Sequence, residues 1–164
     1  MGGSPRVTVL MAVFNGEPYL REAVDSVLAQ TFDDFELLVV NDGSTDGSLG
    51  ILTSYQDPRI RVLDNPRNLG LTPSPNRGLR AARGELVARM DADDVAEPHR
   101  LAVQVAAMDA DPALVLSGSS YRVIDASGRV RRLTTRDLDD YRLRWVALFR
   151  TPLAHTTAMF RRVL

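Results

Sequence analysis

Three carboxylates occur within four residues of this chain, at Asp91, Asp93 and Asp94, directly after the apolar run at 86–90. Carboxylates this close repel one another, so the cluster needs a positive partner, which is a divalent metal, a cationic side chain or solvent. Mg²⁺ and Mn²⁺ prefer oxygen ligands, typically one or two carboxylates with substrate phosphates. Asp91 and Asp93 are therefore candidate ligands of a metal or of a metal-bound diphosphate. Helix capping is the alternative, and we expect it for Asp94 because helix signals begin near Pro98.

A further acid, Asp42, follows the apolar run at 35–40 and precedes Gly43. Its carboxylate could accept hydrogen bonds from a heterocycle, while the glycine keeps the loop thin. The other interpretation is an Asx-type turn, in which Asp42 or Ser44 satisfies nearby backbone amides. Position alone leaves both open.

The two histidines lie in different contexts. His99 follows Pro98 in a first helical turn, which indicates a surface residue. His155 lies in a Pro- and Thr-rich connection. A metal ligand, a phosphate contact and an ordinary turn residue all remain open for His155.

Alternating strands and helices position these residues. Continuous apolar runs predict buried strands at 6–14, 35–40, 60–63, 86–90 and 113–116. Apolar residues at helical spacing predict helices at 18–30, 49–55, 72–82 (closed by Gly84) and from Pro98 to Met108. This alternation predicts an α/β fold with a mainly parallel sheet that is covered on both faces. Ligands of such sheets bind beyond the carboxyl ends of the strands, where Asn15, Asp42 and Asp91 lie.

The alternation stops after Ser117. Two short β-prone runs at 121–124 and 130–133, around a Gly-containing turn, predict a hairpin. A helix is predicted next, with an apolar face formed by Leu138, Tyr141, Trp145 and Leu148. Three acids at its start read as capping residues, namely Asp137, Asp139 and Asp140. The spacing of Trp145 favours a core or interface residue over a sugar platform. After Pro152, residues 158–160 form a candidate last strand.

Composition limits the class of protein. A chain of 164 residues with 45% hydrophobic and 25% charged residues fits one soluble globular domain. The net charge of −1 argues against nucleic-acid binding. The absence of cysteine excludes disulfides and thiolate sites and favours the cytoplasm. Residues 1–5 read as a flexible amino terminus or a cloning remnant without signal-peptide character. No apolar run reaches the roughly 18 residues of a membrane span, and peripheral contact with the inner face of the membrane stays open.

Several common nucleotide and hydrolase motifs are absent from the sequence. No Gly-x-Gly-x-x-Gly follows the first predicted strand, and there is no phosphate-binding Gly-x-x-x-x-Gly-Lys-Ser/Thr loop. No Gly-x-Ser-x-Gly elbow occurs either, which argues against an α/β hydrolase.

Taken in order, the motifs of this chain resemble the inverting family-two glycosyltransferases of the GT-A fold. The resemblance rests on VTVLMAVFN at 7–15, YL at 19–20, QTF at 30–32, VNDGSTD at 40–46, NLG at 68–70, NRG at 76–78, ARGE at 82–85, MDADD at 90–94 and HTTAMFRR at 155–162. The fold that it implies is a Rossmann-like three-layer sandwich with a mainly parallel central sheet, here truncated at the carboxyl terminus.

The resemblance also implies a site for a nucleotide-diphospho-sugar and a divalent metal, Mn²⁺ or Mg²⁺. The implied donor-binding residues are Ala12, Val13, Asn15, Glu17, Asp42, Asn76, Asp91, Ala92 and Asp93. In the family pattern the loop after the first strand cups the base, Asp42 contacts a uracil-type base, and Asn76 helps to order the pocket. The Asp-x-Asp motif contacts the ribose through Asp91 and the metal through Asp93, with Asp91 as a second metal ligand.

The function implied is inverting transfer from a nucleotide-diphospho-sugar, with a UDP-sugar favoured, to a saccharide or other hydroxyl acceptor in polysaccharide or glycoconjugate biosynthesis. We expect residues 6–117 to form the nucleotide-sugar core and 118–164 to hold the hairpin, the helix and the start of the acceptor side. The catalytic base is expected beyond Leu164. The exposed hairpin and last helix favour a homo-oligomer. The alternatives are a sugar nucleotidyltransferase-like enzyme and a non-catalytic Mg²⁺-binding interaction module.

Overall fold

A six-stranded sheet forms the centre of the computed structural model, which describes residues 3–135, 139–148 and 153–162. Its order is β3-β2-β1-β4-β8-β5. The strands are β1 (Val7–Val13), β2 (Phe35–Asn41), β3 (Ile60–Asp64), β4 (Leu86–Asp91), β5 (Leu116–Ser117) and β8 (Met159–Arg161). The first four are mutually parallel, and β8 runs antiparallel to both of its neighbours. The predicted α/β class with a mainly parallel sheet is confirmed.

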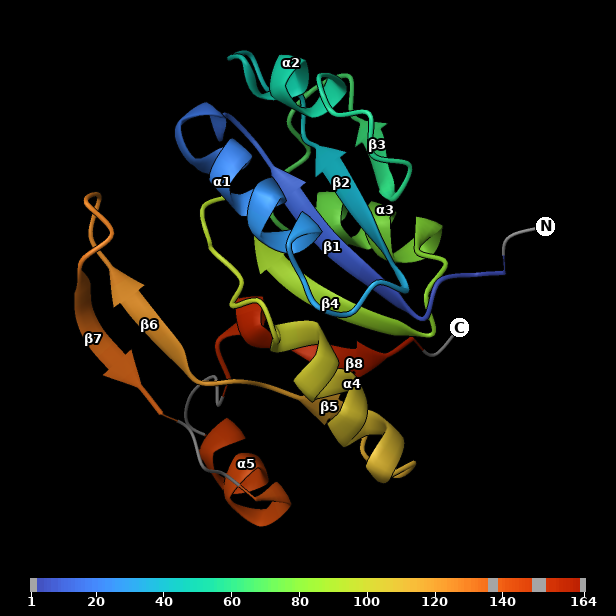
Figure 1. Ribbon diagram of the computed structural model, residues 1–164, viewed down its shortest axis with the longest axis vertical. Coiled ribbons are helices and arrows are strands. Elements are labelled where there is room, and N and C mark those ends of the chain that lie inside the picture. The colour runs from blue at the N-terminus through green and yellow to red at the C-terminus, as the bar shows by residue number, and fades with distance from the viewer. Residues whose placement is uncertain (1–2, 136–138, 149–152, 163–164) are drawn as a thin grey trace.

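Helices cover both faces of this sheet. They are α1 (Glu17–Leu28), α2 (Ser48–Thr53), α3 (Pro73–Ala81) and α4 (Arg100–Ala110). In Figure 1, α1 and α4 lie in front of the sheet and α3 lies behind it. Successive residues of β1 serve opposite faces, so that Val9 and Met11 pack with α1 and α4, whereas Leu10 packs on the side of α3. A strand that is buried on both faces must be apolar throughout, which explains the continuous runs.

Three predicted boundaries are wrong for local reasons. The fifth strand contains only Leu116–Ser117, because hydrogen bonds back to Asp111 hold residues 113–114 in a turn. This strand pairs antiparallel with β8. Helix α4 starts at Arg100 instead of Pro98, whose carbonyl accepts a hydrogen bond from the Thr31 amide. Helix α3 ends at Ala81 because the ψ of Ala82 is 139°, so Gly84 does not close it.

The hairpin and the last helix stand apart from the sheet (Figure 1). Strands β6 (Tyr121–Ile124) and β7 (Val130–Thr134) confirm the hairpin, and α5 (Asp140–Ala147) confirms a helix. Asp139 caps α5 by accepting a hydrogen bond from the Arg142 amide at 2.8 Å. Asp137, Leu138 and Pro152 lie outside the described residues.

The apolar face of α5 is not buried. Trp145 is 58% exposed, so a core position for it is wrong, and Tyr141 and Leu148 are also exposed. An interface role for Trp145 stays a prediction. None of the helices in the described ranges is long and apolar enough to cross a bilayer.

The chain returns to the sheet after α5. A short 3-10 helix, η1 (His155–Thr157), leads into β8, which pairs Met159 with Ala88 of β4 and with Ser117 of β5. The predicted strand at 158–160 is therefore present. It brings η1 beside the carboxyl end of β4, where the acid cluster lies.

Candidate functional site

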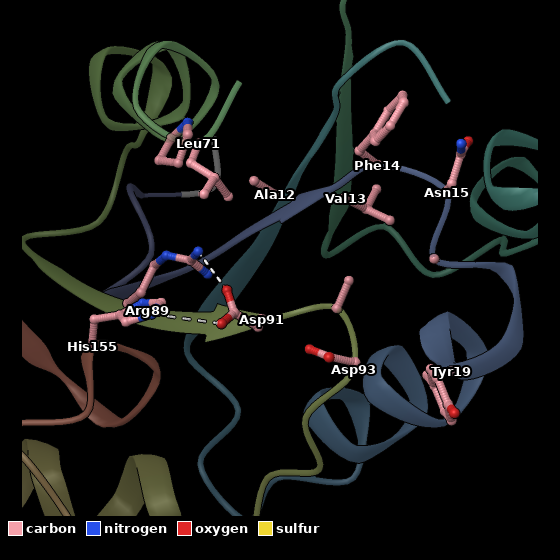
Figure 2. A pocket seen from close by; sticks show the side chains of 13 residues that line it. Ala12, Val13, Phe14, Asn15, Tyr19, Leu71, Arg89, Asp91, Asp93 and His155 are labelled. Atoms are coloured by element: carbon pink, nitrogen blue, oxygen red, sulfur yellow. Dashed lines mark ion pairs between the residues drawn. The ribbon is translucent and has the colours of Figure 1, made fainter. Parts of the chain in front are cut away.

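A cavity of about 690 Å³ opens beyond the carboxyl ends of β1 and β4. Seven of the predicted site residues line it, namely Ala12, Val13, Asn15, Asp91, Ala92, Asp93 and His155. Gly16, Phe14, Tyr19, Leu71, Pro75 and Arg89 complete the lining (Figure 2). The cavity lies where a parallel α/β sheet binds its ligands. Glu17, Asp42 and Asn76 are not among the lining residues.

Asp91 has a cationic partner within its own strand. The Arg89 Nη2 lies 2.5 Å from the Asp91 Oδ1, and alternation along β4 puts the two side chains on one face of the sheet. The His155 Nε2 lies 3.9 Å from the Asp91 Oδ2, a contact that becomes an ion pair when His155 is protonated. Figure 2 shows both contacts as dashed lines. A metal, a cationic side chain and solvent were the possible positive partners of the cluster, and Asp91 has a cationic side chain, the guanidinium of Arg89.

The other two acids of the cluster differ from Asp91. Asp93 is exposed at the cavity wall, and within the described residues its side chain forms no hydrogen bond or ion pair. Burial raises the pKa of Asp94, a hydrogen bond with Thr156 opposes that rise, and the charges of Asp91 and Asp93 add to it. Asp93 is thus the carboxylate available to a ligand.

Asp94 does not cap α4. The helix begins at Arg100 with His99 at its N-cap, and no side chain caps it. Burial lowers the pKa of Arg100 to about 10, and the charge of Asp94 opposes that shift. Asp94 is therefore hydrogen-bonded to Thr156 of η1 and acts on the guanidinium of Arg100 through its charge.

The loop that follows β1 is fastened to the loop that follows β2. Asn15 adopts a φ of 53°, a left-handed conformation that asparagine tolerates, and its Oδ1 accepts a hydrogen bond from the Thr45 amide at 2.8 Å. The Asn15 amide donates to the Ser44 Oγ at 3.0 Å. Glu17 Oε2 accepts a hydrogen bond from the Gly47 amide at 2.8 Å, so Glu17 helps to join the two loops and does not line the cavity. These hydrogen bonds hold the loop that carries Phe14, which is 48% exposed at the cavity.

Asp42 holds the loop between β3 and α3. Its carboxylate is 4% exposed, and its Oδ1 accepts from Asn65 Nδ2 at 2.7 Å, from the Leu69 amide at 2.9 Å and from Ser74 Oγ at 2.5 Å. Its Oδ2 accepts from the Gly70 amide at 2.9 Å. Burial by itself raises the pKa of Asp42, but these four hydrogen bonds outweigh it and leave the pKa below its ordinary value.

The Asx-type turn after β2 uses a neighbour of Asp42. Asn41 Oδ1 accepts from the Ser44 amide at 3.3 Å, whereas Asp42 reaches across to the other loop. Gly43 lets the two loops cross, because it has a φ of 69° and a Cβ there would lie 2.4 Å from the Arg67 carbonyl carbon. The residue after the anchored segment is Leu71, which is 94% exposed and lines the cavity.

Three residues that line the cavity were not predicted from the sequence, although patterns in the sequence could have indicated them; they are Arg89, Phe14 and Tyr19. Arg89 is the one charged residue in the buried run 86–90, two positions before Asp91. Such a residue in a strand shares a face with the acid and is placed to pair with it. Phe14 follows β1 and Tyr19 lies in the first turns of α1, and exposed aromatic rings beside a ligand site are informative. Asn76, by contrast, lies exposed on α3 and outside the lining.

The donor set fits a divalent metal through one carboxylate. In the described ranges, no group of three or more His, Asp or Glu side chains is placed to hold a metal ion. Mg²⁺ and related ions commonly use one or two carboxylates and complete their shells with phosphate and water. Asp93 meets that requirement, while Asp91 is engaged by Arg89.

Comparisons with known proteins show the family of this chain. The family model described as Glycosyl transferase family 2 matches residues 8–164. The putative glycosyltransferase EpsE of Bacillus subtilis is 35% identical over 164 residues, covering 98% of this chain and 58% of that protein.

Two solved structures share the fold. One is the mannosyltransferase PcManGT from Pyrobaculum calidifontis in complex with GDP-Man and Mn²⁺, with a TM-score of 0.70 and 24% identity, covering 96% of this chain and 44% of that one. The other is S. aureus TarS 1-349 in complex with UDP-GlcNAc, with a TM-score of 0.67 and 22% identity, covering 96% and 45%. The chain spans about half the length of the proteins that it matches.

Proposed function

Because this chain belongs to glycosyl transferase family 2, we propose that its cavity binds a nucleotide-diphospho-sugar together with a divalent metal, for inverting transfer to an acceptor hydroxyl. The observation that carries the proposal is the exposed Asp93 carboxylate on a cavity beyond the carboxyl ends of β1 and β4. The ligands of the two similar structures, GDP-Man with Mn²⁺ and UDP-GlcNAc, support the class of donor. We favour a UDP-sugar.

Each part of the cavity has a role in this proposal. The exposed ring of Phe14 offers an apolar surface to the base, and Asp91 accepts hydrogen bonds from the ribose. Asp93 holds the metal. When bound, the metal stabilises the negative charge that develops on the departing nucleoside diphosphate.

Asp42 contributes from behind the cavity wall. A carboxylate oxygen can accept two hydrogen bonds, and the Asp42 Oδ2 accepts one, from the Gly70 amide. Because Asp42 is buried and outside the lining, its contribution is to hold residues 69–70, next to Leu71 at the cavity, and a direct contact with the base stays a prediction. Asn76 supports the pocket through its position on α3.

Isothermal titration calorimetry with UDP, GDP and ADP, each with and without Mn²⁺, tests the proposal. We expect Mn²⁺-dependent binding, strongest for UDP, and a loss of at least about tenfold in affinity, about 1.4 kcal/mol, for Asp93→Ala. Asp33→Ala is the matched control, because Asp33 is also exposed but lies in the loop before β2. The proposal is wrong if none of the three nucleotides binds in the presence of Mn²⁺, or if Asp93→Ala binds as wild type does.

A further inference from the structure

We infer that Arg89 is a positioning residue that engages Asp91 and leaves Asp93 as the one carboxylate of the 91–94 cluster that is open to a metal, so that a divalent ion binds well only together with a nucleoside diphosphate. The inference rests on the proposed function and goes beyond it, because it concerns how metal and nucleotide binding depend on each other.

The pair is partly shielded from water. The side chains of Arg89 and Asp91 are 15% and 31% exposed, and Nη2 and Oδ1 are 2.5 Å apart. An ion pair is screened less at such a site than at an open surface, so the guanidinium competes effectively with a cation for this carboxylate.

Arg89 is also held in place along its length. Its amide donates to the Ala158 carbonyl at 2.8 Å, and its carbonyl accepts from Arg100 Nη2 at 2.8 Å. Its Nη1 donates to the Met90 carbonyl. The main chain of Arg89 is therefore held by α4 and by the residue before β8, and its guanidinium is held by the Met90 carbonyl and by Asp91.

The charges of the cluster lead to the same conclusion. Asp91, Asp93 and Asp94 face two guanidinium groups, those of Arg89 and Arg100. These charges nearly balance, which leaves little net negative charge to attract a divalent ion. A metal at Asp93 would gain its remaining ligands and charge from diphosphate oxygens, so the two ligands bind cooperatively.

Replacing Arg89 exposes this dependence. In Arg89→Gln the Asp91 carboxylate becomes available, and two carboxylates two residues apart face the cavity. We expect Mn²⁺ alone, titrated by electron paramagnetic resonance of the free ion, to bind this variant at least tenfold more tightly than wild type. Arg89→Lys keeps the charge beside Asp91 and is expected to retain the weak binding of wild type. A residue with only a structural role would not raise metal affinity.

Wild type keeps the inference falsifiable if Arg89→Gln folds poorly, because its affinity for Mn²⁺ should rise at least tenfold when UDP is present. Equal Mn²⁺ affinity of wild type with and without UDP would overturn the inference. The double variant Arg89→Gln/Asp91→Asn, in which the summed charge of the pair is that of wild type, is expected to bind Mn²⁺ alone as weakly as wild type does. Equal Mn²⁺ affinity of wild type and folded Arg89→Gln would overturn it as well.

The outcome is separable from that of the proposed function. If wild type binds UDP with Mn²⁺ but Arg89→Gln gains no affinity for Mn²⁺ alone, the inference fails and the function stands. If no nucleotide binds at all, the proposed function fails and the inferred dependence of metal binding on nucleotide fails with it.

Discussion

Replacing Asp42 with asparagine tests how strongly the buried carboxylate holds the β3–α3 loop. The charged side chain accepts four hydrogen bonds, three on Oδ1 and one on Oδ2. Asparagine offers one acceptor oxygen. In its better orientation that oxygen keeps the partners of Oδ1, while the amide group faces the N–H of Gly70. One backbone donor is then left without an acceptor.

The expected cost follows from these contacts. A buried donor without a partner costs about 1–3 kcal/mol, and a hydrogen bond to a neutral acceptor is worth about 1 kcal/mol less than one to a charged acceptor. With about 1 kcal/mol for the unpaired Gly70 amide and about 1 kcal/mol for each of the three weakened hydrogen bonds, Asp42→Asn should lower the free energy of unfolding by about 4 kcal/mol. For a domain of this size, each kcal/mol shifts Tm by about 2–4 °C, so Tm should fall by about 8–16 °C.

The difference should also depend on pH. The pKa of Asp42 in the folded protein lies below its ordinary value, which is about 3.9 in an unfolded chain. The contribution of the ionised group is therefore complete above pH 4 or so and is lost as the pH falls through the folded pKa. Thermal unfolding followed by circular dichroism should show the same gap between wild type and Asp42→Asn at pH 7 and pH 5, and a narrowing gap below about pH 4.

Asp34→Asn serves as the control, because Asp34 is exposed and its main-chain carbonyl, which the substitution keeps, bonds to Val7. A Tm for Asp42→Asn within about 1 °C of wild type at pH 7 would refute the account of Asp42 as the anchor of the loop. A gap that persists at pH values where both proteins carry a neutral side chain would refute the electrostatic part of it.

Glycine substitutions test the packing around the site. Gly78→Ala should destabilise the fold by about 1–3 kcal/mol in urea unfolding, since the new Cβ would lie 2.3 Å from a Leu10 methyl carbon, whereas Gly50→Ala has open space and should be neutral or stabilising by up to about 1 kcal/mol. Equal effects at these two helical positions would contradict the packing described for α3. Gly43→Ala should cost at least about 2 kcal/mol, because it combines a positive φ with a backbone clash at Arg67, and an unchanged urea midpoint would show that the two loops can separate.

The parallel part of the fold could be predicted because burial on both faces leaves a local trace. The apolar residues of β1 and β2 pack either on the side of α3 or against the α1–α4 layer, so the runs are nearly continuous and are easy to locate. The position of β8 leaves no such trace. Met159 pairs with Ala88, far away in the sequence, and nothing local to Met159 indicates that partner.

The site shows the same division. The acid cluster at the end of β4 and the loop at Asn15 could be located from the chain, because polar residues after apolar runs are visible in sequence. The partners of Asp42 could not be predicted, since they come from the loop without periodicity that follows β3 and from Ser74 in the first turn of α3. The pairing of Arg89 with Asp91 could have been predicted, because residues two apart in a strand lie on the same face of the sheet. The capping role expected for Asp94 was wrong because α4 begins later than Pro98 suggests.

The pairing of Ser117 with Met159 has a consequence for how this protein can diversify. The chain leaves the sheet at β5 and comes back on the strand beside it, so the exit and the return are neighbours whatever lies between them. The intervening hairpin and α5 can therefore change in length and sequence without shifting β4 or the cavity at its end. We expect sequence changes in this segment to leave the sheet in place, so that replacing the whole segment is a practical route to recombinant variants that keep the same cavity.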